Sequence, residues 1–334
     1  MEWNHEPANA HAAPPQEVSR LVFASRANVR TGVYDEMERI RASALRHNPP
    51  LGVNTALLYQ SGWFVQWKEG AADAVRKTME RVASDPRHSQ VQLVHQSRGP
   101  RLLERPWSMA IVQCADPPAA MAVRVLEARR RLEDGGEALP TTVWRRLSTP
   151  MRHPGARQQA DPDAFQRVLV CSSAGNASFE LVRWLAQGHG QEVVPRRFAG
   201  AKDLDVGTDY VDFRDGSRVL RVIAMARNGL MLPLTRAFMH DYSHVILLLH
   251  GQREQDTWLV QRVVQACSHL QAPPSLLGVA SSAGAQGRPS RLALRCGLAY
   301  AEALANPDSA PATWAAVSPQ LALWREAAAG APPA

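Results

Sequence analysis

The sequence predicts a mixed protein in which an α+β domain precedes an α/β domain. Short apolar strands alternate with amphipathic helices along most of the 334 residues. A segment over residues 140–163 is rich in proline, arginine and glutamine, which is typical of a boundary between domains. The length also exceeds that of one ordinary domain, and the 45% hydrophobic content suffices for two cores.

Composition excludes several classes of protein. No apolar run is long enough to span a bilayer, and the polar start of the chain does not resemble a signal peptide. The net charge of +7 is modest, and the cluster Arg129–Arg131 is better explained as a solvated helix face than as a nucleic-acid site. The four cysteines are far apart, which predicts reduced thiols and no zinc site. We therefore expect a soluble cytoplasmic protein that binds no membrane and no metal ion.

The first domain follows a leader over residues 1–17, whose prolines and alanines predict mobility. Pro49 and Pro50 stop the first helix, and Ser61–Gly62 forms a hairpin turn. The expected elements are a strand over 20–25, a helix over 33–47, strands over 54–60 and 63–69, a helix over 71–83, and strands over 89–95 and 108–114. This βαββαββ order is the ferredoxin-like pattern, with two helices on one face of a sheet. A flat ligand would fit the cleft between those helices.

One strand of this domain combines aromatic residues with a glutamine. Alternation places Phe64, Gln66 and Lys68 on one face of the strand and Trp67 on the opposite face. A buried glutamine must satisfy an amide donor and a carbonyl acceptor. An isoalloxazine ring offers both kinds of partner along one edge. In the alternative, the strand is half-buried and Gln66 faces water, which would satisfy both groups.

Residues 18–116 resemble the BLUF family, sensors of blue light that use FAD. Several separated motifs carry the resemblance, and each would be weak alone. They are residues 47–53, 56–59 and 64–70, Arg81 with residues 85–88, and residues 107–109. The resemblance implies that FAD lies between the two helices.

The resemblance also implies a set of cofactor-binding residues. Asn48 would contact a ring carbonyl, and Gln66 would rearrange its hydrogen bonds when the flavin is excited. Arg81 and Asp85, four residues apart, would face the polar edge and ribityl chain; without a flavin they would form a surface ion pair. The implied set is Phe23, Ser25, His47, Asn48, Gln66, Arg81, Asp85, Trp107 and Met109.

Two departures from the family pattern bear on function. Phe23 stands where the family has its photoactive tyrosine, and a phenyl ring can neither donate a proton nor hydrogen-bond to the glutamine. Asn54–Thr55 stands where the family usually has threonine-glycine, which makes the strand bulkier. Tryptophans are alternative electron donors, but one near a flavin would quench it rather than drive the glutamine. We expect a domain that binds FAD without the usual tyrosine–glutamine photochemistry.

Residues 166–305 predict an open α/β domain with a mostly parallel sheet. The expected elements are strands over 167–171, 219–225 and 244–250, and helices over 179–187, 258–270 and 292–304. Residues 168–178 occupy the place of a P-loop, but Ala177 stands where the phosphate-binding lysine would be. Together with residues 208–213, 219–225 and 242–250, this segment resembles a degenerate Ras-like bacterial GTPase; a receiver-like module is the alternative.

These interpretations combine into a sensory protein with no catalytic residues. A connecting helix over 117–134 and a linker over 135–165 would join the sensor to a catalytically silent output domain, and residues 306–334 would form a flexible tail. The partners would be flavin, a protein that binds the output domain, and a second copy of the chain. The alternatives are a light-insensitive scaffold and a nucleotide-binding enzyme.

Overall fold

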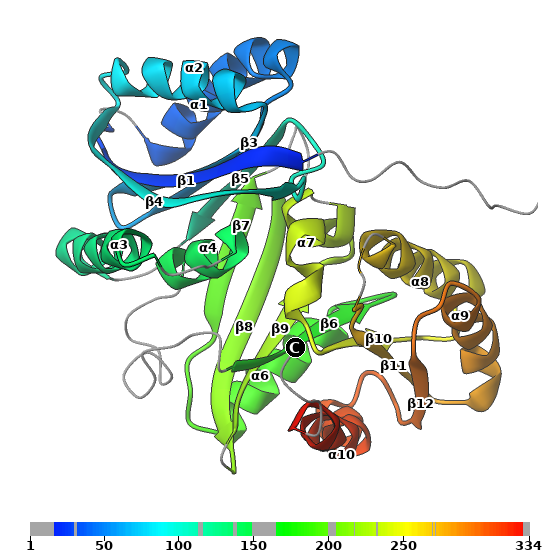
Figure 1. Cartoon of the computed structure of the whole chain (residues 1–334). Coiled ribbons are helices and arrows are strands. Elements are labelled where there is room, and N and C mark those ends of the chain that lie inside the picture. Colours follow the sequence, from blue (N-terminus) through cyan, green and yellow to red (C-terminus); the bar gives the residue numbers. More distant parts are fainter. Residues whose placement is uncertain are drawn as a thin grey trace, which may run out of the picture.

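The computed structural model describes residues 17–29, 32–112, 116–135, 139–148, 165–199, 205–216, 218–231, 233–268, 270 and 272–329. The described strands form one twelve-stranded sheet in the order β12-β11-β10-β6-β9-β8-β7-β5-β2-β3-β1-β4. The last five strands of this order belong to the first half of the chain and the other seven to the second half (Figure 1). The mobile leader expected over 1–17 lies outside the described residues, except that Glu17 already begins β1.

The first half has the predicted βαββαββ order. Its elements are β1 (Glu17–Ala27), α1 (Val33–His47), β2 (Asn54–Gln60), β3 (Trp63–Gly70), α2 (Ala72–Ala83), β4 (His88–Pro100) and β5 (Trp107–Val112). The bounds predicted for α1 and β2 are confirmed. Ser61 and Gly62 both have positive φ, 49° and 76°, as a tight hairpin turn between right-twisted strands requires.

Helices cover both faces of these five strands (Figure 1). On one face, α1 and α2 lie over a small core that includes Met37, Ile40 and Phe64. On the other, α3 (Pro118–Glu133) and α4 (Pro140–Ser148) cover a larger core that includes Val65 and Trp67. The alternation along β3 thus separates the two cores as predicted. On α3, Arg129 and Arg131 form ion pairs with Glu133 and Glu127, which fits a solvated helix face.

Helix α4 corrects the linker expected over residues 135–165. Pro140 suits the first position of a helix, where its missing N–H leaves no bond unmade. Val143, Trp144 and Leu147 then share a face and are buried beneath the sheet of the first half. The stability gained by burying that face keeps the segment helical, although its prolines and arginines are typical of a linker. Residues 149–164 of the expected linker lie outside the described residues.

The second half is an open sheet flanked by helices on both faces. Its strands are β6 (Phe165–Ser172), β7 (Val194–Ala199), β8 (Asp205–Asp215), β9 (Arg218–Met225), β10 (His244–Leu248), β11 (Ser275–Ala280) and β12 (Tyr300–Leu304). Its helices are α6 (Ala177–Gly188), α7 (Pro233–Phe238), α8 (Arg253–Cys267), α9 (Ala283–Arg295) and α10 (Ala310–Ala329), with short 3-10 turns η3 (Arg227–Met231) and η4 (Met239–Asp241). Strands β9, β6, β10, β11 and β12 are parallel, whereas β7 and β8 are antiparallel. The sheet is therefore mostly parallel, with an antiparallel ribbon on one side.

Two expectations for the second half are wrong. The helix predicted over 292–304 ends at Arg295, because Gly297 takes a φ of 75°, and residues 300–304 pair with β11 instead. The tail expected over 306–334 contains α10, whose Val317 and Leu321 are buried in the core that also holds α6. Residues 310–329 therefore form a helix, and its first part buries an apolar face, where a flexible tail was expected.

The two halves share a sheet and a core, where separately folded domains were expected. Strand β5 pairs antiparallel with β7 through Ile111–Arg197 and Val112–Arg196. Below the sheet, Leu234 and Ala237 of α7 join the core formed by β3 and α4. None of the described helices has the length and hydropathy needed to cross a membrane.

Candidate functional site

A cleft opens between α1 and α2, above β3 and β5. It is lined by Ile40, Ser43, Ala44, His47, Asn48, Gln66, Lys68, Thr78, Arg81, Val82, Asp85, Arg87, His88 and Trp107. Six of the nine residues predicted to bind the cofactor are therefore together in one cleft: His47, Asn48, Gln66, Arg81, Asp85 and Trp107. Phe23, Ser25 and Met109 do not line it.

Gln66 is nearly buried and faces the cleft, with 3% of its surface exposed. Within the described part of the chain, its amide has no hydrogen-bond partner. The buried indole N–H of Trp107, on the same wall, also lacks a partner among these residues. Polar groups that are removed from water normally have partners. The cleft thus presents donors and an acceptor that a polar ring edge would satisfy.

Asn48 closes the end of α1, and its position is set by β2. Its backbone N–H continues the helix by donating to the Ala44 carbonyl. Its side-chain amide donates to Thr55 Oγ1 at 3.1 Å. Thr55, one of the two departures from the family pattern, therefore orients Asn48 toward the cleft wall. Next to it, His47 Nδ1 donates to the Ser43 carbonyl at 2.8 Å.

Arg81 and Asp85 do not form the ion pair that the sequence suggested as an alternative. Asp85 lies beyond the end of α2, because Pro86 prevents the helix from continuing. Its carboxylate instead binds Arg87, with 2.6 Å between Oδ2 and Nη2. Burial raises the pKa of Asp85, but the hydrogen bonds from Arg87 outweigh burial and hold that pKa below its usual value. Arg81 is left at the mouth of the cleft with no carboxylate within ion-pair distance among the described residues.

Lys68 also lines the cleft, although it was not among the predicted cofactor-binding residues. It is two residues from Gln66 on β3 and only 3% exposed. Burial, together with the nearby charge of Arg81, lowers the pKa of Lys68 to about 7. The alternation along β3, which places Lys68 on the same face as Gln66, is the sequence pattern that could have predicted its place in the site. Lys68 therefore adds a basic side chain to the cleft, beside Gln66 and near Arg81.

Lys68→Met is expected to remove a pH dependence from the stability of the flavin-free protein. The native pKa is about 7 and the unfolded value is 10.5, so the unfolded chain binds more protons between these pH values. The free energy of unfolding then rises with pH across this window, by at most about 1.4 kcal/mol per pH unit. Urea unfolding at pH 7 and pH 9.5 measures it. An equal difference between wild type and Lys68→Met at both pH values would contradict this account of Lys68.

The other three predicted residues lie just behind the cleft. Phe23 on β1 is paired directly with Gln66 on β3 and shares its face. The Phe23 ring meets His88 edge-on, with 6.4 Å between ring centroids. Ser25 Oγ hydrogen-bonds His88 Nδ1 at 2.7 Å, and burial lowers the pKa of His88 to about 4. Met109 packs in the core beneath α1. His88 thus separates Phe23 and Ser25 from the open cleft.

The segment at the P-loop position joins β6 to α6, as predicted, but it has different chemistry. Ala177 is the first residue of α6, so no lysine extends from this position toward a phosphate. Ser173 Oγ contacts His250 Nδ1 at 3.1 Å, and His250 Nε2 contacts Asp308 Oδ1 at 3.1 Å. Ser173 has no exposed surface, so a substrate cannot reach its hydroxyl in this conformation. No group of three or more metal-ligating side chains occurs among the residues that the structure describes.

Comparison with known proteins identifies the first half. The family model described as sensors of blue light using FAD (BLUF) matches residues 18–110. A photoactivated adenylate cyclase subunit beta from Euglena longa is 38% identical over 60 residues. That match covers 18% of this chain and only 7% of the Euglena protein, so the rest of that protein has no counterpart in the match.

Two solved structures, one of them described as a BLUF protein, are also similar to this chain. The dark-state structure of BlrB is 23% identical, with a TM-score of 0.26, over 34% of this chain and 83% of that one. The photo-activated state of BlsA is 21% identical, with a TM-score of 0.29, over 39% and 91% of the two chains. None of the relatives named here is a GTPase, so they do not support that resemblance for the second half. The family match does identify residues 18–110, which form a BLUF domain, of the family that senses blue light with FAD.

Proposed function

We propose that this protein is an FAD-binding sensor of blue light or redox state, with a second half that acts as a non-catalytic output module. The proposal rests on the cleft between α1 and α2, which is lined by the nearly buried Gln66 and by Trp107, whose buried indole N–H has no partner among the described residues. The sensor would comprise residues 18–116, with 117–134 as the connecting helix and 166–305 as the output module.

The donors in the cleft fit the polar edge of a flavin. An isoalloxazine edge carries carbonyl oxygens and ring nitrogens, which accept hydrogen bonds from amides and cations. Asn48 and Gln66 would hold this edge, and Lys68 would place a basic group beside it. Arg81, at the mouth of the cleft, would face the ribityl chain and phosphates. Bound FAD supplies blue-light absorption and reversible electron uptake.

Phe23 favours a sensor whose photochemistry differs from the usual tyrosine–glutamine route. It is the cross-strand neighbour of Gln66, so this is the position from which a phenol would reach the glutamine. A phenyl ring there leaves the amide of Gln66 without that partner. The flavin would still bind, because Phe23 lies behind the cleft rather than on its wall.

The second half would act by binding a partner rather than by catalysis. Ala177 and the buried Ser173 both leave the P-loop position without a reactive group that a nucleotide could reach. The shared core beneath the sheet offers a physical connection to the sensor, since Trp67 follows Gln66 in β3 and lies against α4 and α7. A partner protein, or a second copy of the chain, would bind differently when the state of the flavin changes.

FAD affinity tests the proposed cleft. Asn48→Ala is expected to weaken FAD binding about threefold to tenfold, since it removes one hydrogen bond worth about 0.5–1.5 kcal/mol. Asn28→Ala is the matched control, because the Asn28 amide is exposed and donates to the Pro86 carbonyl outside the cleft. Fluorescence titration of the flavin-free protein measures both. Failure of the wild-type chain to bind FAD, or equal affinities of the two variants, would count against the proposal.

A further inference from the structure

A buried lysine faces the cleft in which the flavin is proposed to bind. Lys68 lies two residues from Gln66 on β3, so both side chains leave the same face of the sheet, and each is only 3% exposed. Among the described residues, none forms a hydrogen bond or an ion pair with the Lys68 side chain. A cation that is removed from water normally has such a partner, because burial without one is costly.

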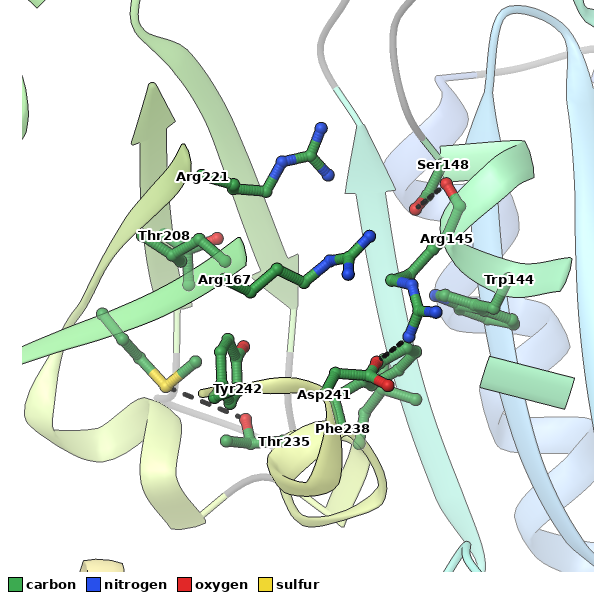
Figure 2. Close-up of a pocket in the computed structure, with 13 residues that line it drawn as sticks. Trp144, Arg145, Ser148, Arg167, Thr208, Arg221, Thr235, Phe238, Asp241 and Tyr242 are labelled. Atoms are coloured by element: carbon green, nitrogen blue, oxygen red, sulfur yellow. Dashed lines mark hydrogen bonds and ion pairs between the residues drawn. The ribbon is translucent and has the colours of Figure 1, made fainter. Parts of the chain in front are cut away.

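Two other largely buried cations of this chain have carboxylate partners. Figure 2 shows a second cavity, between α4 and the second half, that is lined by Arg145, Arg167 and Arg221. Arg145 forms an ion pair with Asp241 (Figure 2). Arg221 binds both carboxylate oxygens of Asp212 at 2.8–3.1 Å. In these two pairs the fold itself supplies the negative charge that a buried guanidinium needs.

The carboxylates near the cleft are already bound to arginines. Asp85, which lines the cleft, contacts Arg87 through both oxygens at 2.6–3.0 Å. Glu36 on α1 forms ion pairs with Arg39 at 3.5 Å and with Arg87 at 3.6 Å. Neither carboxylate lies within ion-pair distance of Lys68. The negative charge that would balance a Lys68 ammonium therefore has to come from a ligand.

The surroundings of Lys68 in the empty cleft favour its neutral form. Burial, and after it the nearby charge of Arg81 on α2, lowers the pKa of Lys68 to about 7. Burial also lowers the pKa of His88 on β4 to about 4, so this ring adds no positive charge at neutral pH. His47 on α1 completes the titratable groups that line the cleft. Above pH 7 the side chain of Lys68 is therefore mainly an amine in the flavin-free protein.

A flavin beside Gln66 would bring a charge that depends on its redox state. At pH 8 the oxidised ring is neutral, whereas the fully reduced ring carries one negative charge after it gains two electrons and one proton. An ammonium beside a negative charge is stabilised more strongly in a buried cleft than in water. A positive group beside the ring in turn favours its reduced form. The amine of Lys68 is placed to gain a proton when the ring gains its charge.

We propose that Lys68 couples proton uptake to reduction of the bound flavin. Two electrons from a soluble reductant and one proton reduce the ring, and a second proton from solvent converts the Lys68 amine to an ammonium. Reoxidation releases both protons. This inference rests on the proposed binding of FAD beside Gln66. Its consequence is that the reduction potential of the flavin depends on pH more steeply than it would without Lys68.

Redox titration of the FAD-loaded full chain between pH 7.5 and pH 9 tests this coupling. Wild type is expected to take up two protons per two electrons, and Lys68→Met only one. Each proton changes the equilibrium tenfold per pH unit, so the potentials should fall by about 60 and about 30 mV per pH unit, respectively. Lys77→Met is the matched control, because Lys77 is an exposed lysine on α2 outside the cleft. It should keep the wild-type slope. Equal slopes for wild type and Lys68→Met would overturn the proposal.

A count of protons taken up by wild type tests the same coupling without any change to the chain, so a poorly folded variant leaves the proposal testable. The FAD-loaded protein is reduced at pH 8 in weakly buffered solution with a pH indicator. Bound FAD is expected to take up one proton more per molecule than free FAD, and an equal count would overturn the role of Lys68 alone. If the wild-type chain does not bind FAD, the proposed function and this inference are both wrong.

Discussion

Trp67→Ala is expected to lower the free energy of unfolding by about 3–5 kcal/mol, the usual range for removing a buried large aromatic side chain. Trp67 is fully buried and belongs to the core shared by β3, α4 and α7. Its ring lies 6.2 Å from Trp144 and 6.4 Å from Phe238, measured between centroids. The substitution would leave a cavity where both halves of the chain meet. Urea unfolding followed by circular dichroism measures the loss.

The control is Trp184→Ala, because Trp184 on α6 is 36% exposed and away from this core. Its loss should be clearly smaller. A double-mutant cycle of Trp67→Ala with Phe238→Ala then measures the contact between the halves, and a coupling of about 0.5–1.5 kcal/mol is expected for such an edge-on pair. A coupling of zero would show that the halves do not stabilise each other through this contact.

Local patterns predicted the first half well, because its elements depend on short-range signals. Pro49 and Pro50 set the end of α1, and the period of two along β3 placed Gln66 on one face and Trp67 on the other. The same period placed Lys68 in the cleft. Its importance emerged only from its burial, which depends on residues distant in the sequence.

Long-range pairing was what the sequence could not reveal. The contact between β5 and β7 joins residues more than eighty positions apart, and no local pattern encodes it. Arg167 and Arg221 likewise become neighbours only through the register of two parallel strands. Helix α4 was missed because a short helix is stabilised by what it packs against, and its own composition resembled that of a linker.

The second large effect expected is a gain of photochemistry from a single hydroxyl. Phe23→Tyr adds a phenol on the strand next to Gln66, on the same face of the sheet. A tyrosine there can donate a hydrogen bond to the amide and an electron and proton to excited flavin, which phenylalanine cannot do. We expect the FAD-loaded variant to show a reversible red shift of its absorption after blue light. Phe64→Tyr is a suitable control, because Phe64 packs in the core beneath α1 and pairs with Ser25 rather than with Gln66.

We infer that the BLUF domain binds FAD beside Gln66 but, with phenylalanine at position 23, lacks the hydroxyl required for the usual photochemistry. The most direct test is the light-minus-dark absorption spectrum of the FAD-loaded full chain, recorded for wild type and Phe23→Tyr under the same illumination. We expect a flat difference spectrum for wild type and a reversible red shift for Phe23→Tyr. A reversible red shift in wild type, or none in FAD-loaded Phe23→Tyr, would contradict it.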